Sequence, residues 1–152
     1  MELVSDRRYP FPVPPVALWS ALAATDDYQG WWPWLRSFEA HGLHTGDEWQ
    51  CTVRPPLPYT LRFTIHLLEV DRPRLVTSRI SGDIRGIARL DITTAPAGSE
   101  LHLTSTLTPS SRAFGVVAAI ARPVVRRGHD WVLDTGAQQF LSRALDADVA
   151  GP

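Results

Sequence analysis

The segment Val13–Trp34, which reads VPPVALWSALAATDDYQGWWPW, says most about the fold of this chain. Pro14 and Pro15 suit the first turn of a helix, because a backbone N–H there has no partner within the helix. Apolar residues then recur at helical spacing, which predicts a short amphipathic helix over roughly Pro15–Thr25. Two aspartates and Gly30 follow and close that helix.

Three tryptophans come directly after this helix, at Trp31, Trp32 and Trp34. Their side chains are too large to be left in water, so we expect them to cover a core or the mouth of a cavity. We expect Gly30–Leu35 to form a short second helix or turn, with Trp31 or Trp32 at the rim of a cavity. A strand can begin again at Ser37–Ala40.

The composition is that of one domain over residues 1–152, with a tail from Asp146 to Pro152 that we expect to fray. A chain of 152 residues can bury a sizeable core, and 44% apolar with 20% charged residues is typical of a soluble protein. The formal net charge of −1 provides no field that would recruit nucleic acid or an anionic membrane. We therefore expect no nucleic-acid partner.

Other classes of protein are excluded by residues that the chain lacks. No apolar run approaches the ~20 residues that cross a bilayer, so we expect no transmembrane segment, and no signal-peptide core is recognisable. Cys51 is the only cysteine, which rules out an intrachain disulfide and favours a cytoplasmic protein. All the basic residues are arginine, so lysine Schiff-base chemistry is excluded.

Alternating apolar and polar residues dominate the middle of the chain. The clearest case is Tyr59–Leu67, where Leu61, Phe63 and Ile65 alternate with polar residues. Short turns rich in proline or glycine separate such segments, which predicts an antiparallel meander with one face in water. With a first strand near the N-terminus, the predicted strands are Arg7–Phe11, Ser37–Ala40, Trp49–Val53, Tyr59–Leu67, Val76–Ser81, Gly86–Thr93 and Leu101–Thr108.

The last part of the chain is predicted to be helical. Ser110 and Ser111 can cap a segment over Arg112–Ala121, whose role stays open. Pro123 then suits the start of a longer helix that runs to about Leu145.

The sheet and this longer helix must bury their apolar faces against each other, yet both faces are unusual. The buried side of the helix has two glycines and carries polar residues such as His129 and Gln139. The inner face of the sheet has small residues at Gly82, Gly86 and Ala88. Small residues that face small residues leave unfilled volume, which costs on the order of 24 cal/mol per Å³. We therefore predict a cavity that holds a ligand or water.

The predicted ligand contacts come from both walls of this cavity. They are Trp49, Val53, Tyr59, Phe63, Ile65, Ile80, Gly86, Ala88, Val125, Gly128, His129, Val132, Thr135 and Gln139. A plainer interpretation stays open, because glycines can simply let the helix approach the sheet closely. A histidine on an apolar face is likewise more often a satisfied core residue than a ligand contact.

The order of the predicted elements and the opening segment together resemble the START-like superfamily, also called SRPBCC. Its members typically show a helix with a Pro/Ala-x-x-x-Val/Leu-Trp pattern, an aspartate and a Tyr-x-x-Trp-x-Pro-like turn. The corresponding residues here are Pro15, Leu18-Trp19, Asp26 or Asp27, Tyr28, Trp31-Trp32 and Pro33. The resemblance implies an α+β helix-grip fold, in which a seven-stranded antiparallel sheet wraps around the C-terminal helix and encloses a hydrophobic cavity. It also implies two short helices between the first two strands, and no common cofactor.

No GxSxG, HExxH, CxxC, GxGxxG or P-loop pattern is present. His41, His44, Asp47 and Glu48 superficially resemble a metal cluster. They occupy a predicted loop without the rigid spacing of a helical site, so we expect a solvated turn and no metal.

Two further features have a plain interpretation. Cys51 is expected to face inward as a small hydrophobic residue rather than to act as a nucleophile. Arg122, Arg126 and Arg127 form a basic cluster near His129, which we expect to be a solvated helix face. Contact with an acidic head group is the alternative.

Three functions stay open at this point. The leading hypothesis is binding of a hydrophobic small molecule, such as a lipid or polyketide, without a cofactor. The second is an aromatase/cyclase- or dehydratase-like enzyme with His129 and Tyr59 as acid/base candidates. Further acid/base candidates are Arg54, Thr135 and Asp83. The third is a protein-interaction module that exposes an apolar patch over Trp31–Trp34. The ligand and the oligomeric state stay open.

Overall fold

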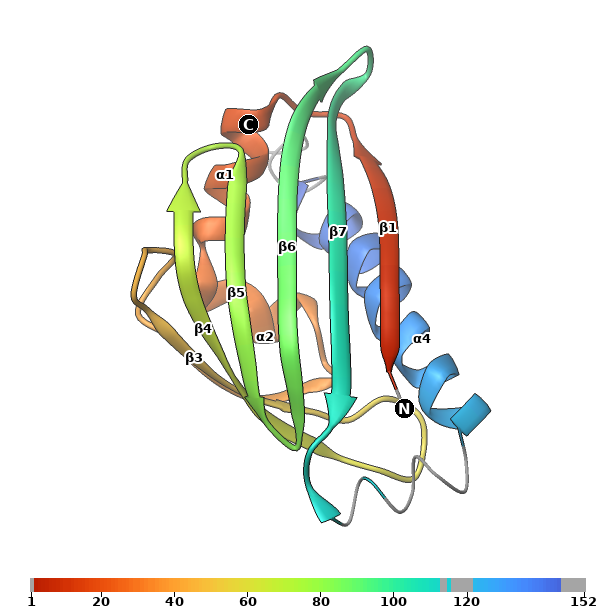
Figure 1. Cartoon of the computed structure of the whole chain (residues 1–152). Coiled ribbons are helices and arrows are strands. Elements are labelled where there is room, and N and C mark those ends of the chain that lie inside the picture. The colour runs from red at the N-terminus through yellow and green to blue at the C-terminus, as the bar shows by residue number, and fades with distance from the viewer. Residues whose placement is uncertain (1, 113–114, 116–121, 146–152) are drawn as a thin grey trace.

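The structure is a computed structural model that describes residues 2–112, 115 and 122–145. Its centre is a seven-stranded sheet with the order β1-β7-β6-β5-β4-β3-β2, in which all neighbours are antiparallel. Figure 1 shows this curved sheet with the helices on one side of it. The strands are β1 (Leu3–Phe11), β2 (Leu35–Glu39), β3 (Glu48–Val53), β4 (Leu61–Asp71), β5 (Leu75–Gly82), β6 (Ile84–Ala95) and β7 (Gly98–Pro109).

The first helix and the long helix both begin at prolines, as predicted from the sequence. Pro14 is the boundary residue of the first helix, and Pro123 is the second residue of the long one. Most of the predicted segment Arg112–Ala121 lies outside the described residues. The helices are α1 (Pro15–Ala23), the 3-10 turn η1 (Thr25–Asp27), α2 (Tyr28–Trp31), α4 (Arg122–Phe140) and the π-helical turn η2 (Leu141–Leu145).

This architecture confirms the predicted helix-grip arrangement, with α1 and α2 between the first two strands and α4 at the C-terminal end. The main differences are at strand ends. β1 begins at Leu3 instead of Arg7, because residues 3–6 already pair with residues 104–107 of β7. Tyr59 lies in the loop before β4 rather than in the strand.

Two groups of buried side chains fill the space between the sheet and the helices. The larger group has Tyr28 at its centre, and its ring lies 4.8 to 5.7 Å from four other aromatic rings. Those rings belong to Trp31, Trp32, Phe38 and Trp49. The smaller group consists of Leu3, Ile80, Ile84, Leu107 and Val125.

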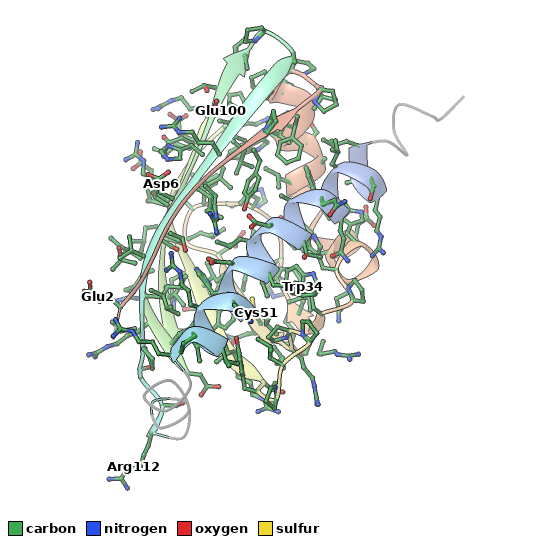
Figure 2. The ribbon with its side chains drawn as sticks, turned by 90° about the vertical axis from the view of Figure 1, so that its right-hand side faces the viewer. Glu2, Asp6, Trp34, Cys51, Glu100 and Arg112 are labelled. Atoms are coloured by element: carbon green, nitrogen blue, oxygen red, sulfur yellow. The ribbon has the colours of Figure 1, made fainter. Side chains whose placement is uncertain are left out.

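The tryptophan segment is fixed to α4 by two hydrogen bonds. The indole N–H of Trp32 donates to the Gly136 carbonyl oxygen, and that of Trp34 donates to Gln139 Oε1, each at 2.9 Å. Figure 2 shows Trp34 beside the helix. Trp31 is 8% exposed, and the other two are half-buried. The exposed tryptophan patch expected of an interaction module is therefore not formed.

The small residues of the sheet have a different role from the predicted one. A Cβ on Gly82 would come within 2.7 Å of the Arg62 carbonyl oxygen. A Cβ on Gly86 would collide with the carbonyl oxygen of Thr106. The prediction that these two glycines leave unfilled volume is wrong, because neighbouring backbone already occupies the space. They allow the strands to approach each other closely.

Candidate functional site

A cavity of about 170 Å³ lies between the sheet and the first half of α4. An engineered apolar cavity of about 150 Å³ binds benzene, so this space admits a small aromatic ring. Its walls come from β1, from β3–β7, from the loop after β3 and from α4. The lining residues are Leu3, Val53, Pro55, Tyr59, Leu61, Phe63, Ile80, Ile84, Ala88, Leu103, Ser105, Leu107, Val125, Gly128, His129, Val132 and Leu133.

Most of the predicted contact residues lie at this cavity. The alternation of the strands and the helical spacing of α4 place them on facing walls, as expected. They are Val53, Tyr59, Phe63, Ile80, Ala88, Val125, Gly128, His129 and Val132.

Two predicted contacts have structural partners elsewhere. Trp49 lies in the aromatic group around Tyr28, and its indole N–H donates to the Gly42 carbonyl oxygen at 2.8 Å. Gln139 accepts the hydrogen bond from Trp34. The Trp49 indole N–H and the Gln139 Oε1 atom are therefore occupied away from the cavity.

Three other predicted contacts also lie off the cavity wall. Gly86 faces the backbone of β7, and Ile65 packs between the two core groups. Thr135 is half-buried on α4 and does not line the cavity. Strand alternation cannot separate such positions from lining ones, because it gives the face of a residue and not its depth.

Other lining residues were not predicted, and the clearest of them lie on β7. Leu103, Ser105 and Leu107 share the inner face of that strand. Their alternation was visible in the sequence, so they could have been found by following the inner face across the sheet. The remaining unpredicted lining residues are Leu3, Pro55, Leu61, Ile84 and Leu133.

Tyr59 closes the cavity where the loop after β3 meets α4. A Cβ on Gly128 would collide with the Tyr59 hydroxyl group and lie 2.8 Å from Leu57 Cδ1. Gly128 thus makes room for side chains of this loop, whereas the plainer interpretation had the helix glycines approach the sheet. Burial raises the pKa of Tyr59 to about 12, so its hydroxyl group is protonated at neutral pH.

His129 lies on the α4 wall, and its Nε2 is 2.8 Å from the hydroxyl oxygen of Ser5 on β1. Burial lowers the pKa of His129, and the nearby Arg126 and Arg7 lower it further, while Asp130 opposes them. The imidazole is therefore neutral at pH 7.

Polar residues join the edge strand β1 to α4 beside the cavity. Arg7 Nη2 lies 3.1 Å from Asp130 Oδ1, and the hydroxyl group of Tyr9 donates to Asp134 Oδ1 at 2.7 Å. Arg7 Nε also lies 3.5 Å from Asp134 Oδ1, so the charge of this arginine partly offsets those of the two aspartates.

A second hollow of about 180 Å³ continues along α4 toward the tryptophans. It shares Leu103, Val132 and Leu133 with the first cavity. Trp32 and Trp34 line it. A ligand longer than one ring therefore has a continuous apolar wall to follow.

The other acid/base candidates do not reach the cavity. Arg54 is exposed, and the Asp83 carboxylate accepts a hydrogen bond from the backbone N–H of Arg62 at 2.9 Å. Among the predicted acid/base residues, His129 and Tyr59 are the ones that line it.

The other polar groups singled out in the sequence do not line the cavity. In the loop that superficially resembled a metal cluster, His44 Nδ1 lies 3.2 Å from Asp47 Oδ2, and across the described ranges no three His, Cys, Asp or Glu residues could hold a metal ion. Burial raises the pKa of Cys51 to about 12, which keeps its thiol protonated. Arg126 donates to the Val4 carbonyl oxygen at 2.7 Å, so this arginine ties α4 to β1.

Comparison with known proteins places this fold and cavity in a family. Residues 5–143 match the family described as polyketide cyclase / dehydrase and lipid transport. The chain belongs to this family. The match spans the sheet and α4, so the resemblance to the START-like superfamily is confirmed. No curated protein sequence matches the chain significantly.

Solved structures of the same fold are similar along nearly the whole chain. The ZhuI aromatase/cyclase from Streptomyces sp. R1128 has a TM-score of 0.79 at 16% identity, covering 99% of this chain and 98% of that one. Ara h 8.0201 has a TM-score of 0.68 at 15% identity, covering 96% and 99%. The protein TTHA0849 from Thermus thermophilus has a TM-score of 0.68 at 14% identity, covering 93% and 98%. At these identities the likeness concerns the fold of this family member.

None of the helices in the described part of this family member is both long and apolar enough to span a membrane.

Proposed function

We propose that this protein binds a hydrophobic small molecule, such as a lipid or a polyketide, between its sheet and α4. The observation that carries the proposal is the cavity of about 170 Å³ with almost wholly apolar walls. At ~24 cal/mol per Å³, leaving such a volume empty costs on the order of 4 kcal/mol. An apolar ligand offsets that cost by restoring contacts with the walls.

The test uses N-phenyl-1-naphthylamine, an uncharged probe whose fluorescence rises in apolar surroundings. Its three aromatic rings need more room than the cavity alone, so it would extend into the adjoining hollow along α4. Ala88 lies on the inner face of β6 and lines the cavity, so Ala88→Leu fills part of it. We expect this variant to bind the probe at least roughly ten-fold more weakly and to unfold at a higher denaturant concentration. Native mass spectrometry of the purified protein would identify any ligand that it retains.

Thr106→Leu is the matched control, because Thr106 lies on the opposite face of the sheet, beside Ile87. It should leave probe affinity unchanged. If Ala88→Leu is more stable but binds the probe as tightly as the original protein, the ligand does not occupy this cavity. Ala88→Val is a smaller filling change for the case in which leucine prevents folding.

A second candidate function is acid/base catalysis on a polyketide-type substrate. It is favoured by His129 and Tyr59, which line the same cavity as a neutral imidazole and a protonated phenol. The double variant His129→Ala, Tyr59→Phe should then lose turnover while keeping probe binding. Retained turnover would show that the reaction does not need these two residues.

A further inference from the structure

The cavity wall contains three polar side chains, those of Tyr59, Ser105 and His129. Tyr59 is protonated and His129 is neutral at pH 7, for the reasons given above. No carboxylate or guanidinium group is among the lining residues. A charged ligand group would thus lose its hydration without meeting an opposite charge.

Ser105 differs from the other buried serines near it. It is 9% exposed, and its hydroxyl oxygen has no hydrogen-bond partner in the described part of the chain. Ser78, two strands away, has a partner, because its hydroxyl group donates to the Ala88 carbonyl oxygen at 3.4 Å. A buried hydroxyl group without a partner is destabilising. We therefore expect Ser105, which lies among the leucines of β7, to have a function that offsets this cost.

The position of Ser105 places it near His129. Ser105 pairs directly with Ser5 across β7 and β1, and such opposed Cβ atoms lie about 4.5–5.5 Å apart. Ser5 is the residue that contacts His129 Nε2. Ser105 and His129 are therefore both neighbours of Ser5 and form one polar corner of the cavity.

We infer that this corner recognises an uncharged hydroxyl group on a cyclic hydrophobic ligand, with the Ser105 O–H donating to the ligand oxygen. The inference rests on the proposed function, because it assigns a polar contact within the same cavity. It names the ligand class as neutral alcohols or phenols, and it excludes carboxylates and phosphates.

The experiment compares three ligands that share one ring: toluene, p-cresol and 4-methylbenzoate. Their dissociation constants are measured at pH 7 by NMR titration of the original protein, of Ser105→Ala and of Ser78→Ala. We expect Ser105→Ala to reduce the preference for p-cresol over toluene by roughly three- to ten-fold, which is the effect of one hydrogen bond. The matched control Ser78→Ala should keep the original preference. We also expect 4-methylbenzoate to bind the original protein at least roughly ten-fold more weakly than p-cresol, because its charge would be desolvated without a partner.

Stability gives a second readout that does not depend on the ligand. Ser105→Ala removes a hydroxyl group without a partner, so it should keep or raise the melting temperature of the ligand-free protein. Ser78→Ala removes a bonded hydroxyl group and should lower it. A lower melting temperature in Ser105→Ala would show that the hydroxyl group is satisfied within the protein and would overturn the inference.

The outcomes separate this inference from the proposed function. If toluene binds but Ser105→Ala leaves the preference for p-cresol unchanged, the inference fails and the proposed function stands. Tight binding of 4-methylbenzoate would also overturn the inference, because it requires a cationic partner. If neither toluene nor N-phenyl-1-naphthylamine binds, the proposed function fails and the inference fails with it.

Discussion

His129 links the chemistry of the cavity to the pH dependence of stability. Its pKa is lowered in the folded protein from an ordinary value of 6.5, so below pH 6.5 the unfolded chain binds more protons than the folded one. This residue's contribution to stability is therefore complete above pH 6.5. It decreases as the pH falls through the folded-state pKa.

We expect the free energy of unfolding to fall more between pH 7.5 and pH 5.0 in the original protein than in His129→Gln. Urea titrations at both pH values measure the difference between the two proteins. The other histidines are present in both proteins, so their contribution to the pH dependence of stability cancels in the comparison. Equal losses in both would show that His129 is not held neutral by the fold.

Tyr28 provides a separate test of the core at the scale of one residue. Its ring is 4% exposed among four aromatic neighbours, and its hydroxyl group donates to the Leu22 carbonyl oxygen. Tyr28→Phe should lower the free energy of unfolding by about 1 kcal/mol, the value of a hydrogen bond. Tyr28→Ala should lower it by about 3–5 kcal/mol, because it leaves a cavity. Denaturant unfolding of both variants checks whether ring packing outweighs the hydrogen bond.

At the scale of elements, glycine has two different uses in this protein. A Cβ on Gly86 meets backbone, whereas a Cβ on Gly128 meets the ends of two side chains, Tyr59 and Leu57. Gly86 also has a φ of 153°, which L-residues rarely adopt. Backbone on a neighbouring strand cannot move without breaking the sheet, but a tyrosine ring can turn away.

We therefore expect Gly86→Ala to lower the free energy of unfolding by about 1–3 kcal/mol or more. Gly128→Ala should change it by less than about 1 kcal/mol, since alanine also favours a helix interior. The same Gly128→Ala protein should show altered affinity for N-phenyl-1-naphthylamine, because Tyr59 is displaced from the cavity wall. Thermal unfolding and probe titration of the two variants together test this contrast. Similar destabilisation by both would contradict it.

The same elements show what the sequence could predict. Period-two spacing was sufficient for β3 to β7, helical spacing for α1 and Pro123 for the start of α4, because each depends on local patterning. Spacing also placed Val125 and Ala88 on facing walls. It could not show that the Thr106 backbone fills the space beside Gly86. Nor could it show that Gln139 accepts a hydrogen bond from Trp34. Those facts depend on contacts between residues distant in sequence.

At the scale of the whole molecule, a ligand in the cavity is linked to folding by mass action. A ligand that binds the folded state alone adds about 2.7 kcal/mol to stability at about 100 times its dissociation constant. We expect N-phenyl-1-naphthylamine at that excess to raise the melting temperature of the original protein. The rise should be much smaller in Ala88→Leu when both receive the same probe concentration. Calorimetric scans measure it, and equal rises would place the probe at another site.

The hydrogen bonds between the tryptophan segment and α4 also bear on synthesis by the ribosome. They join residues that are 104 and 105 positions apart, from Trp32 to Gly136 and from Trp34 to Gln139. The tryptophans are therefore synthesised about a hundred residues before the helix that covers them. A nascent chain that ends before α4 exposes this group, and exposed apolar surface of this kind recruits chaperones. This group is thus fully covered only once α4 is available to pack against it.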